Sequence, residues 1–280
     1  MLTPIINVLR KQLVILLLLS VTPYCYSDSP SGENVKSIRI MTVVICQQGN
    51  FLHYLLEPYL AGKNINIDYS QGHHSQVAAA VKRGDVDIAI THTKVKAMQE
   101  LVTAGLLIDG QTVFANPKAF LGPAGDPAGI AGQVDAAAVM QQIQEKGFCY
   151  VINPHENMTR LQLDLLQGTN SGRNCVIDNA QNTRDALQMA DDKGAYTMWG
   201  LHPYLEKGKG KLQPIVIPDQ RLLQNLGAWV VQGSDVTEEA RDLVEYLASD
   251  AARVRIIKFR FPDYDTIQPW WPPVQKDRTK

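Results

Sequence analysis

Short apolar segments alternate with amphipathic segments along most of the chain, and this alternation is the strongest constraint on its fold. The segment "VDIAI", residues 86–90, is apolar almost throughout, as expected for a strand that is buried on both faces. Segments with the apolar spacing of helices flank it on both sides. Strands alternating with helices in this way predict an α/β fold whose mainly parallel sheets are flanked by helices.

The alternation falls into two blocks, separated by the stretch "QTVFANPKAFLGPAGDPAGIAG", which is extended and then rich in Gly and Pro. The first block is predicted to contain strands 38–45, 65–69 and 86–91 and helices 51–61, 75–83 and 96–104. The second is predicted to contain strands 149–152, 175–177 and 195–199 and helices 134–146, 159–167 and 183–193. The strands "LQPIVIPD" and "GAWVVQG" and a helix at 238–248 then follow, so the chain is expected to cross between two lobes twice.

The predicted organisation is a two-lobe, type II periplasmic-binding-protein-like fold. Its segments are a signal peptide at 1–27, a first lobe at 28–114 and 215–265, a second lobe at 115–214, and a tail at 266–280. In open α/β sheets, ligands bind beyond the carboxyl ends of the strands, near the N-termini of helices. Two such lobes joined by paired strands form a cleft that closes on a ligand by a hinge motion.

The first 27 residues have the three parts of a secretory signal. Arg10 and Lys11 precede an apolar run at 13–19, and Cys25-Tyr26-Ser27 precedes Asp28. The run is shorter than the ~20 residues that a bilayer span needs, which predicts a cleaved signal and a periplasmic location. A lipid anchor on Cys25 is the alternative, although no small residue lies next to the cysteine.

The charge balance and the motifs exclude several classes of function. The whole chain has a formal net charge of −1, and removal of residues 1–27 leaves about −3 without a basic cluster. A nucleic-acid partner is therefore not expected, because phosphate binding requires a basic face. The chain has no nucleophile elbow, phosphate loop or defined metal motif, so neither catalysis nor a cofactor is expected.

Three cysteines remain after the predicted cleavage, an odd number for an oxidising compartment. Cys149 and Cys175 each begin a strand-like segment, "CYVI" and "CVID", so a disulfide between neighbouring strands is the expected pair. Cys46 is then left over, in a loop.

The tail "QPWWPPVQKDRTK" places Trp270 and Trp271 before two prolines. Proline excludes this stretch from the interior of a helix or a strand. Two roles remain open from the sequence: the tail clasps the first lobe, or it contacts a partner.

Residues 84–132 resemble the extracytoplasmic tungstate-binding proteins of ABC importers. The shared features are a GD-x-D strand that ends in a histidine, here His92, and the turn "GPAGDPAGI". The later stretch "NTRDALQMADDKGAYTMWGLHPYL" is similar to the "ADEKGAYTLTDRGTYL" region of the same family. The resemblance covers most of the mature chain and implies a solute-binding protein that works with an ABC permease.

The chain departs from the family at its anion-binding loops. The family's "TTTS" corresponds here to residues 42–45, where Thr42 alone keeps a hydroxyl. The family's "SRGDDSGTH" corresponds to "INPHENMTR", with Asn153 in place of the Arg, Asn157 in place of the Ser, and Thr159 retained. A desolvated anion needs charge-assisted hydrogen bonds, so tungstate as the ligand does not follow from the resemblance. We expect Asn153→Arg to enhance any residual oxyanion binding.

Candidate ligand-binding residues are the polar side chains in loops that should face the cleft. The buried strand at 86–91 runs into Thr91-His92-Thr93, the expected rim of the site. The first-lobe candidates are Thr42, Cys46, Gln47, Gln48, His73, Thr91, His92 and Thr93. The second-lobe candidates are Asn153, His155, Asn157, Thr159, Arg160, Arg184, Tyr196 and Thr197.

These candidates differ in the chemistry that they offer. Gln47 and Gln48 offer amide donors, and an arginine beside a helix N-terminus, such as Arg160 or Arg184, can bind a carboxylate or an oxyanion. The histidines are expected to hydrogen-bond a solute or a neighbouring loop. Metal binding together with Cys46 is the alternative, but no ligand spacing supports it, so no metal site is predicted.

The predicted function is capture of a small oxyanion, or another small polar or anionic solute, for an ABC importer by a monomeric exported protein. Two other readings remain. The chain could be a periplasmic accessory or sensor domain that has kept the fold without transport, or it could be a metal-binding protein.

Overall fold

The computed structural model describes residues 35–167, 175–208 and 210–274, without the side chains of residues 156 and 157. The predicted signal peptide and the side chain of Asn157 therefore lie outside the described part of the chain. None of the helices that the structure describes has the length and apolarity to cross a membrane.

A seven-stranded mixed sheet runs through the described residues in the order β2-β1-β3-β9-β4-β7, with β8 paired to β4. Its strands are β1 (Lys36–Val43), β2 (Ile65–Gly72), β3 (Ile88–His92), β4 (Leu107–Gly122), β7 (Thr197–Gly200), β8 (Gln213–Ile215) and β9 (Leu223–Val231). A separate two-stranded sheet contains β5 (Tyr150–Val151) and β6 (Val176–Ile177). The α/β fold class is confirmed, but the large sheet is mixed rather than mainly parallel as predicted, because β9 pairs antiparallel with β3 and β4 pairs antiparallel with β7, β8 and β9.

Parallel pairing is confined to β1 with β2, β1 with β3, and β5 with β6 among the named strands. Strand β4 is antiparallel to β9 from Leu107 to Pro117, and antiparallel to β7 from Lys118 to Leu121. The pairing of β4 with β9 is antiparallel because β4 carries the chain out to the second lobe and β9 brings it back. Lys118 is the first residue of β4 whose partner lies on β7.

The predicted helices are all present, with ends shifted by a few residues. They are α1 (Phe51–Leu60), α2 (His74–Arg83), α3 (Lys96–Thr103), α4 (Ala136–Glu145), α5 (Glu156–Gln167), α6 (Thr183–Lys193) and α8 (Thr237–Ala248). Two helices were not predicted: α7 (Leu201–Lys207), which directly follows β7, and α9 (Asp250–Lys258), which Ser249 caps. Two short 3₁₀ segments, η1 (Val44–Asn50) and η2 (Gln220–Leu222), complete the described elements.

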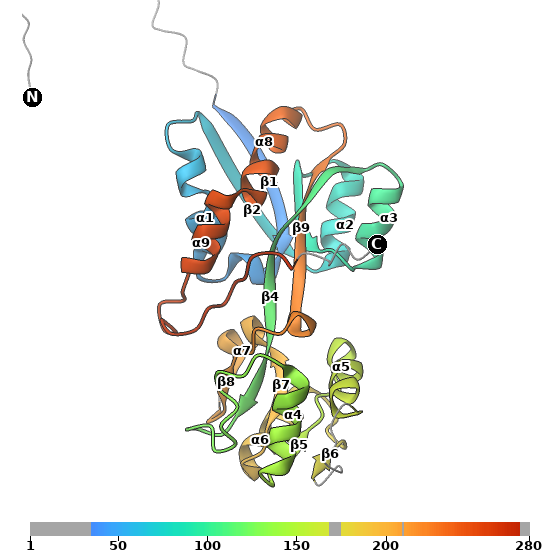
Figure 1. The fold of residues 1–280 in the computed structure, drawn as a ribbon. Coiled ribbons are helices and arrows are strands. Elements are labelled where there is room, and N and C mark those ends of the chain that lie inside the picture. The colour runs from blue at the N-terminus through green and yellow to red at the C-terminus, as the bar shows by residue number, and fades with distance from the viewer. Residues whose placement is uncertain (1–34, 168–174, 209, 275–280) are drawn as a thin grey trace, which may run out of the picture. The chain divides into compact units, whose positions relative to one another are not determined.

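The first lobe buries both faces of its sheet. Figure 1 shows α1, α8 and α9 on one side of β1, β2 and β3, and α2 and α3 on the other. On the first side, the ring of Phe51 stacks on that of Trp270 at 4.4 Å, and the ring of Phe114 meets Trp270 edge-on at 5.0 Å. The fully buried Trp270 shows that the tail clasps the first lobe, one of the two predicted roles.

The tail also contacts both crossing strands. Trp271 forms an antiparallel bridge to Ala115 of β4, and the backbone of Val274 exchanges two hydrogen bonds with the Asn225 side chain on β9. This segment therefore holds β4 and β9 together at the place where the lobes are joined.

The second lobe has its own core on both sides of β4, β7 and β5. One group of buried residues includes Phe120 and Met140, and another includes Leu121 and Leu201. The predicted disulfide is present: Cys149 and Cys175, directly before β5 and β6, are joined with their Cα atoms 4.5 Å apart.

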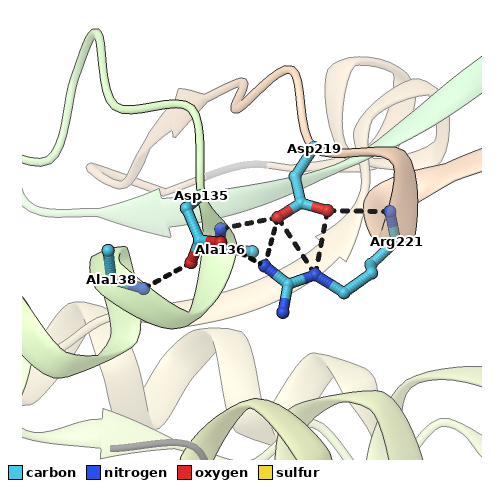
Figure 2. A network of polar contacts seen from close by, with 5 residues as sticks. All are labelled: Asp135, Ala136, Ala138, Asp219 and Arg221. Atoms are coloured by element: carbon cyan, nitrogen blue, oxygen red, sulfur yellow. Dashed lines mark hydrogen bonds and ion pairs between the residues drawn. The ribbon is translucent and has the colours of Figure 1, made fainter.

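A charged network fixes the start of α4 to the returning chain (Figure 2). Asp135 caps α4 by accepting a hydrogen bond from the Ala138 N–H, and Asp219 accepts one from the Ala136 N–H. The guanidinium of Arg221 donates to both carboxylates. Burial raises the pKa of Asp219, but the hydrogen bonds from Arg221 and Ala136 outweigh that effect, so its pKa is lowered overall.

Candidate functional site

The polar end of β3 forms one hydrogen-bonded rim with the start of α2 and with the crossing strand β4. Nδ1 of His74, the first residue of α2, lies 2.6 Å from the hydroxyl of Thr91. Nε2 of His92 lies 3.0 Å from Oδ1 of Asn116 on β4, and the two imidazole rings are 5.2 Å apart. The polar end of β3 is therefore held in a network, here called the rim, which includes Asn116, a residue that the sequence did not single out. Its role as a ligand site stays a prediction.

Both rim histidines are neutral at neutral pH. Burial lowers the pKa of His92 to about 4, and the neighbouring Lys118 and a protonated His74 both oppose its protonation further. Burial, together with the neighbouring His73, also lowers the pKa of His74. Since Oδ1 of Asn116 accepts the hydrogen bond, Nε2 of His92 carries the proton. No described hydrogen bond uses the amide nitrogen of Asn116, which is therefore left as a donor.

Lys118 is the charged group closest to this rim on β4. It lies two residues beyond Asn116, and alternate residues of a strand share a face. Its exposed fraction is 5%, yet its ammonium makes no ion pair or hydrogen bond with the described residues. Burial and the charge of Lys94 lower its pKa to about 8. Lys118 was not predicted as a site residue, although the sequence contains a signal for it. It is the one charged residue in "VFANPKAFLG", a stretch that is otherwise apolar or neutral.

The loop after β1 contributes less to the rim than predicted. Thr42 and Cys46 are fully buried, and Cys46 lies in the first-lobe core, where burial raises the pKa of its thiol to about 12. The reason is that η1 follows β1 immediately and directs the side chain of Cys46 toward the first-lobe core. Nε2 of Gln47 is buried without a hydrogen bond to any described group.

Gln48 and His202 tie the two lobes together. Gln48 donates from Nε2 to a carboxylate oxygen of Glu206 at 2.8 Å, and its Oε1 lies 3.2 Å from Nδ1 of His202. Nε2 of His202 lies 2.9 Å from the backbone oxygen of Pro269 in the tail. His202 is fully buried against Trp270, and burial lowers its pKa to about 4. The sequence did not indicate His202, because it belongs to the unpredicted α7.

Asn153 was predicted to match the family's arginine and to contact the ligand, but it is fully buried within the second lobe. It donates to the Met198 backbone oxygen at 3.0 Å. Its Oδ1 accepts from the Thr183 hydroxyl at 3.0 Å and from the His155 N–H at 3.1 Å. Its amide group thus connects β7, α6 and the loop before α5, and the predicted ligand contact is replaced by an internal one.

Tyr196 and Thr197 also face the second-lobe interior rather than a cleft. The Tyr196 hydroxyl donates to Asp126 at 2.8 Å and accepts from the Ala128 N–H at 2.9 Å, which fixes the "GPAGDPAGI" turn. The Thr197 hydroxyl donates to the backbone oxygen of Val151 at 2.8 Å. Both side chains are fully buried because β7 lies between β4 and β5.

Five other predicted residues lie at the surface or in partly exposed loops. Thr159 bonds back to the His155 and Asn153 carbonyls, and Arg160 pairs with Asp164 across one helical turn. Thr93 lies 3.4 Å from the Asn225 backbone oxygen. His73 precedes α2, and His155 precedes α5 and is exposed.

Arg184 lies elsewhere on the second lobe. It is exposed in the first turn of α6 and lines a hollow of about 570 Å³ together with Trp199 and Lys207. Among the described residues, no group of three or more His, Cys, Asp or Glu side chains could hold a metal ion.

The family follows from comparison with known proteins. Residues 50–260 match the family model described as bacterial extracellular solute-binding protein. The chain belongs to this family. It is 26% identical over 255 residues to the tungstate-binding protein TupA of Peptoclostridium acidaminophilum, covering 86% of this chain and 89% of that protein.

Solved structures share the fold of this family member. The tungstate-binding protein TupA from Desulfovibrio alaskensis G20 superposes with a TM-score of 0.64 at 19% identity, covering 86% of this chain and 100% of that chain. The tungstate ABC transporter structure from Geobacter sulfurreducens gives 0.54 at 24% identity, covering 81% and 98%. The predicted two-lobe, type II fold is thereby confirmed, and so is the resemblance to tungstate-binding-type solute-binding proteins.

Proposed function

We propose that this solute-binding protein captures a small anion outside the cytoplasm and delivers it to the permease of an ABC importer. The observation that carries the proposal is the rim of β3, where two neutral histidines and Asn116 lie beside the buried cation Lys118. No described carboxylate perturbs the pKa of either His92 or Lys118. A site of this kind favours an anion over a cation.

Relatives that bind tungstate or other anions support the anionic class. The ligand itself is proposed more broadly, as an oxyanion or a small carboxylate, because the loops that hold the anion in the family carry different residues here. Gln47, His73, Thr93, His155 and Arg160 remain proposed contributors from the surrounding loops. Export through a cleaved signal at 1–27, the lobe boundaries near residues 115 and 215, and a monomeric state are part of the same proposal.

A thermal-shift screen of residues 28–280 tests the proposal. The probes are tungstate, molybdate, sulfate, acetate, succinate, amino acids, zinc and copper. A ligand present at 100 times its Kd adds about 2.7 kcal/mol to the free energy of unfolding, which is a readily measured shift. We expect at least one anion to stabilise the protein. Stabilisation by zinc or copper alone, or by none of the probes, would contradict an anion-binding function.

A further inference from the structure

We propose that Lys118 supplies the positive charge that holds the ligand, so that the anion site is built against the crossing strand β4 and the end of β3. This inference rests on the proposed function and specifies its site. The ligand class is a compact anion with at least two acceptor oxygens, either an inorganic oxyanion or a short carboxylate. Asn153, the candidate in the second-lobe loop, is fully buried and bonded within its lobe, so a lysine on the crossing strand is proposed to supply the charge for the ligand.

The burial of Lys118 is the first argument. Lysine side chains are rarely buried unless they are paired, since a desolvated ammonium without a partner is strongly destabilising. Lys118 is only 5% exposed as a residue, and no described carboxylate, carbonyl or hydroxyl accepts a hydrogen bond from it. Its Nζ is not among the fully buried atoms without a partner, so the ammonium stays accessible to a small anion. A bound anion would supply the missing acceptor.

The charged surroundings of Lys118 are the second argument. The titratable groups that interact with it are Lys94, in the loop after β3, and His92, whose pKa the Lys118 charge lowers. His74, the first residue of α2, has its ring 5.2 Å from that of His92. Each of these groups is either cationic or neutral, so the local field attracts an anion and nothing described cancels it.

Hydrogen-bond donors complete the site. Asn116 faces the same side of β4 as Lys118 and has an unused amide nitrogen, because its Oδ1 is bound to His92. An ammonium and an amide N–H two residues apart on one strand can donate to two oxygens of the same small anion. His92 keeps the amide in the orientation that presents its nitrogen, and so it acts as a positioning residue.

The location of Lys118 connects the site to domain motion. Pro117 is the last residue of β4 that pairs with β9, and Lys118 is the first that pairs with β7. An anion bound to Lys118 therefore sits where the strand passes from one lobe to the other. Residues from both lobes can reach it there.

The test is isothermal titration of the mature protein and three variants with tungstate, molybdate, sulfate, acetate and succinate. Lys118→Met should weaken binding of the best probe by about 100-fold or more, as expected when a buried charge loses its partner. Lys118→Arg keeps the charge and should retain binding within about tenfold of the wild type. Lys94→Met removes an equal charge from an exposed neighbouring position and should cost about threefold or less.

Two further readouts separate a binding role from a structural one. Without ligand, Lys118→Met should raise the melting temperature, because it removes an unpaired buried charge. The affinity of the wild type should fall as the pH rises through about 8, where the Lys118 ammonium loses its proton, whereas that of Lys118→Arg should not.

The outcomes distinguish the two levels of the proposal. If the wild type binds a probe and Lys118→Met binds it equally well, the assignment of Lys118 is wrong and the proposed function stands. The assignment is also wrong, with the function intact, if Lys94→Met and Lys118→Met lose equal affinity. If the wild type binds none of the anions, both the assignment and the proposed function are wrong.

Discussion

The rim of β3 and the loop that begins at Asn153 were both predicted from the sequence to contact the ligand, and they use their polar groups in opposite ways. In the second lobe, the side chains of Asn153, Tyr196 and Thr197 are engaged in internal hydrogen bonds. At the rim, the Lys118 ammonium and the Asn116 amide nitrogen remain without described partners. The polar side chains of the second-lobe loop thus stabilise the protein, whereas Lys118 and Asn116 at the rim are available to a ligand.

The largest effect is expected from Asn153→Leu. It leaves the Met198 carbonyl, the His155 N–H and the Thr183 hydroxyl without their partner, at a cost of about 2–4 kcal/mol in the free energy of unfolding. Urea denaturation measures this cost, and Asn66→Leu at an exposed position of β2 is the matched control. If the Asn153→Leu protein were as stable as the wild type but had lost anion binding, Asn153 would be a ligand-binding residue and not a structural one.

The structure also changes the expectation for Asn153→Arg. The position has no exposed surface, so an arginine would bury an unpaired guanidinium or disrupt the loop. We therefore expect loss of stability rather than the enhanced oxyanion binding that the family comparison suggested.

Asn116→Asp tests whether a negative charge placed at the rim weakens anion binding. A carboxylate at this position would neutralise Lys118 from within the protein and repel an incoming anion. We expect anion affinity, measured by calorimetry, to fall by about 30-fold or more. Asn66→Asp adds the same charge at an exposed position of β2 and should have little effect. An unchanged affinity in Asn116→Asp would place the ligand away from the rim.

The smallest effect is expected from Arg221→Met in the charged network of Figure 2. The loss of its bonds to Asp135 and Asp219 should cost about 1–2 kcal/mol of stability without changing anion affinity. The comparison variant is Arg160→Met, which breaks only an exposed pair within α5.

The same network predicts a dependence of stability on pH. The folded-state pKa of Asp219 is lowered, so its stabilising contribution is present above the unfolded-state pKa and is lost as the pH falls through the folded-state pKa. Arg221→Met should therefore lose less stability on acidification than the wild type does. Denaturation midpoints measured between about pH 7 and about pH 3 check this, and parallel curves for the two proteins would count against the network.

The order of the elements was predictable because it depends on local patterns. The alternation of short apolar segments with amphipathic segments located the strands and helices. The strand-like segments that begin at Cys149 and Cys175 indicated the disulfide. Helix α9 was missed because it follows α8 after a single capping residue, Ser249, and the boundary between two adjacent helices has little periodicity signal.

The side-chain directions at the site were not predictable in the same way. Whether Asn153 points into its lobe depends on α6 and β7, which approach it only after the chain has folded. The tie through His202 likewise requires η1, α7 and the tail to meet. Lys118 was visible as a charge in an apolar strand, but its lack of a partner is a property of the packed structure.

The aromatic cluster around Trp270 has a consequence for the order in which the lobes fold. Phe51 comes from the beginning of the described chain and Trp270 from near its end, yet their rings stack in the same core. Strand β9 and helices α8 and α9, which complete the same lobe, also come late in the sequence. All residues from Phe51 to Trp270 must therefore be present before the first lobe can complete its core. The buried core residues of the second lobe all lie between Ala119 and Leu222, so that core can form before the chain from α8 to Trp270 has joined the first lobe.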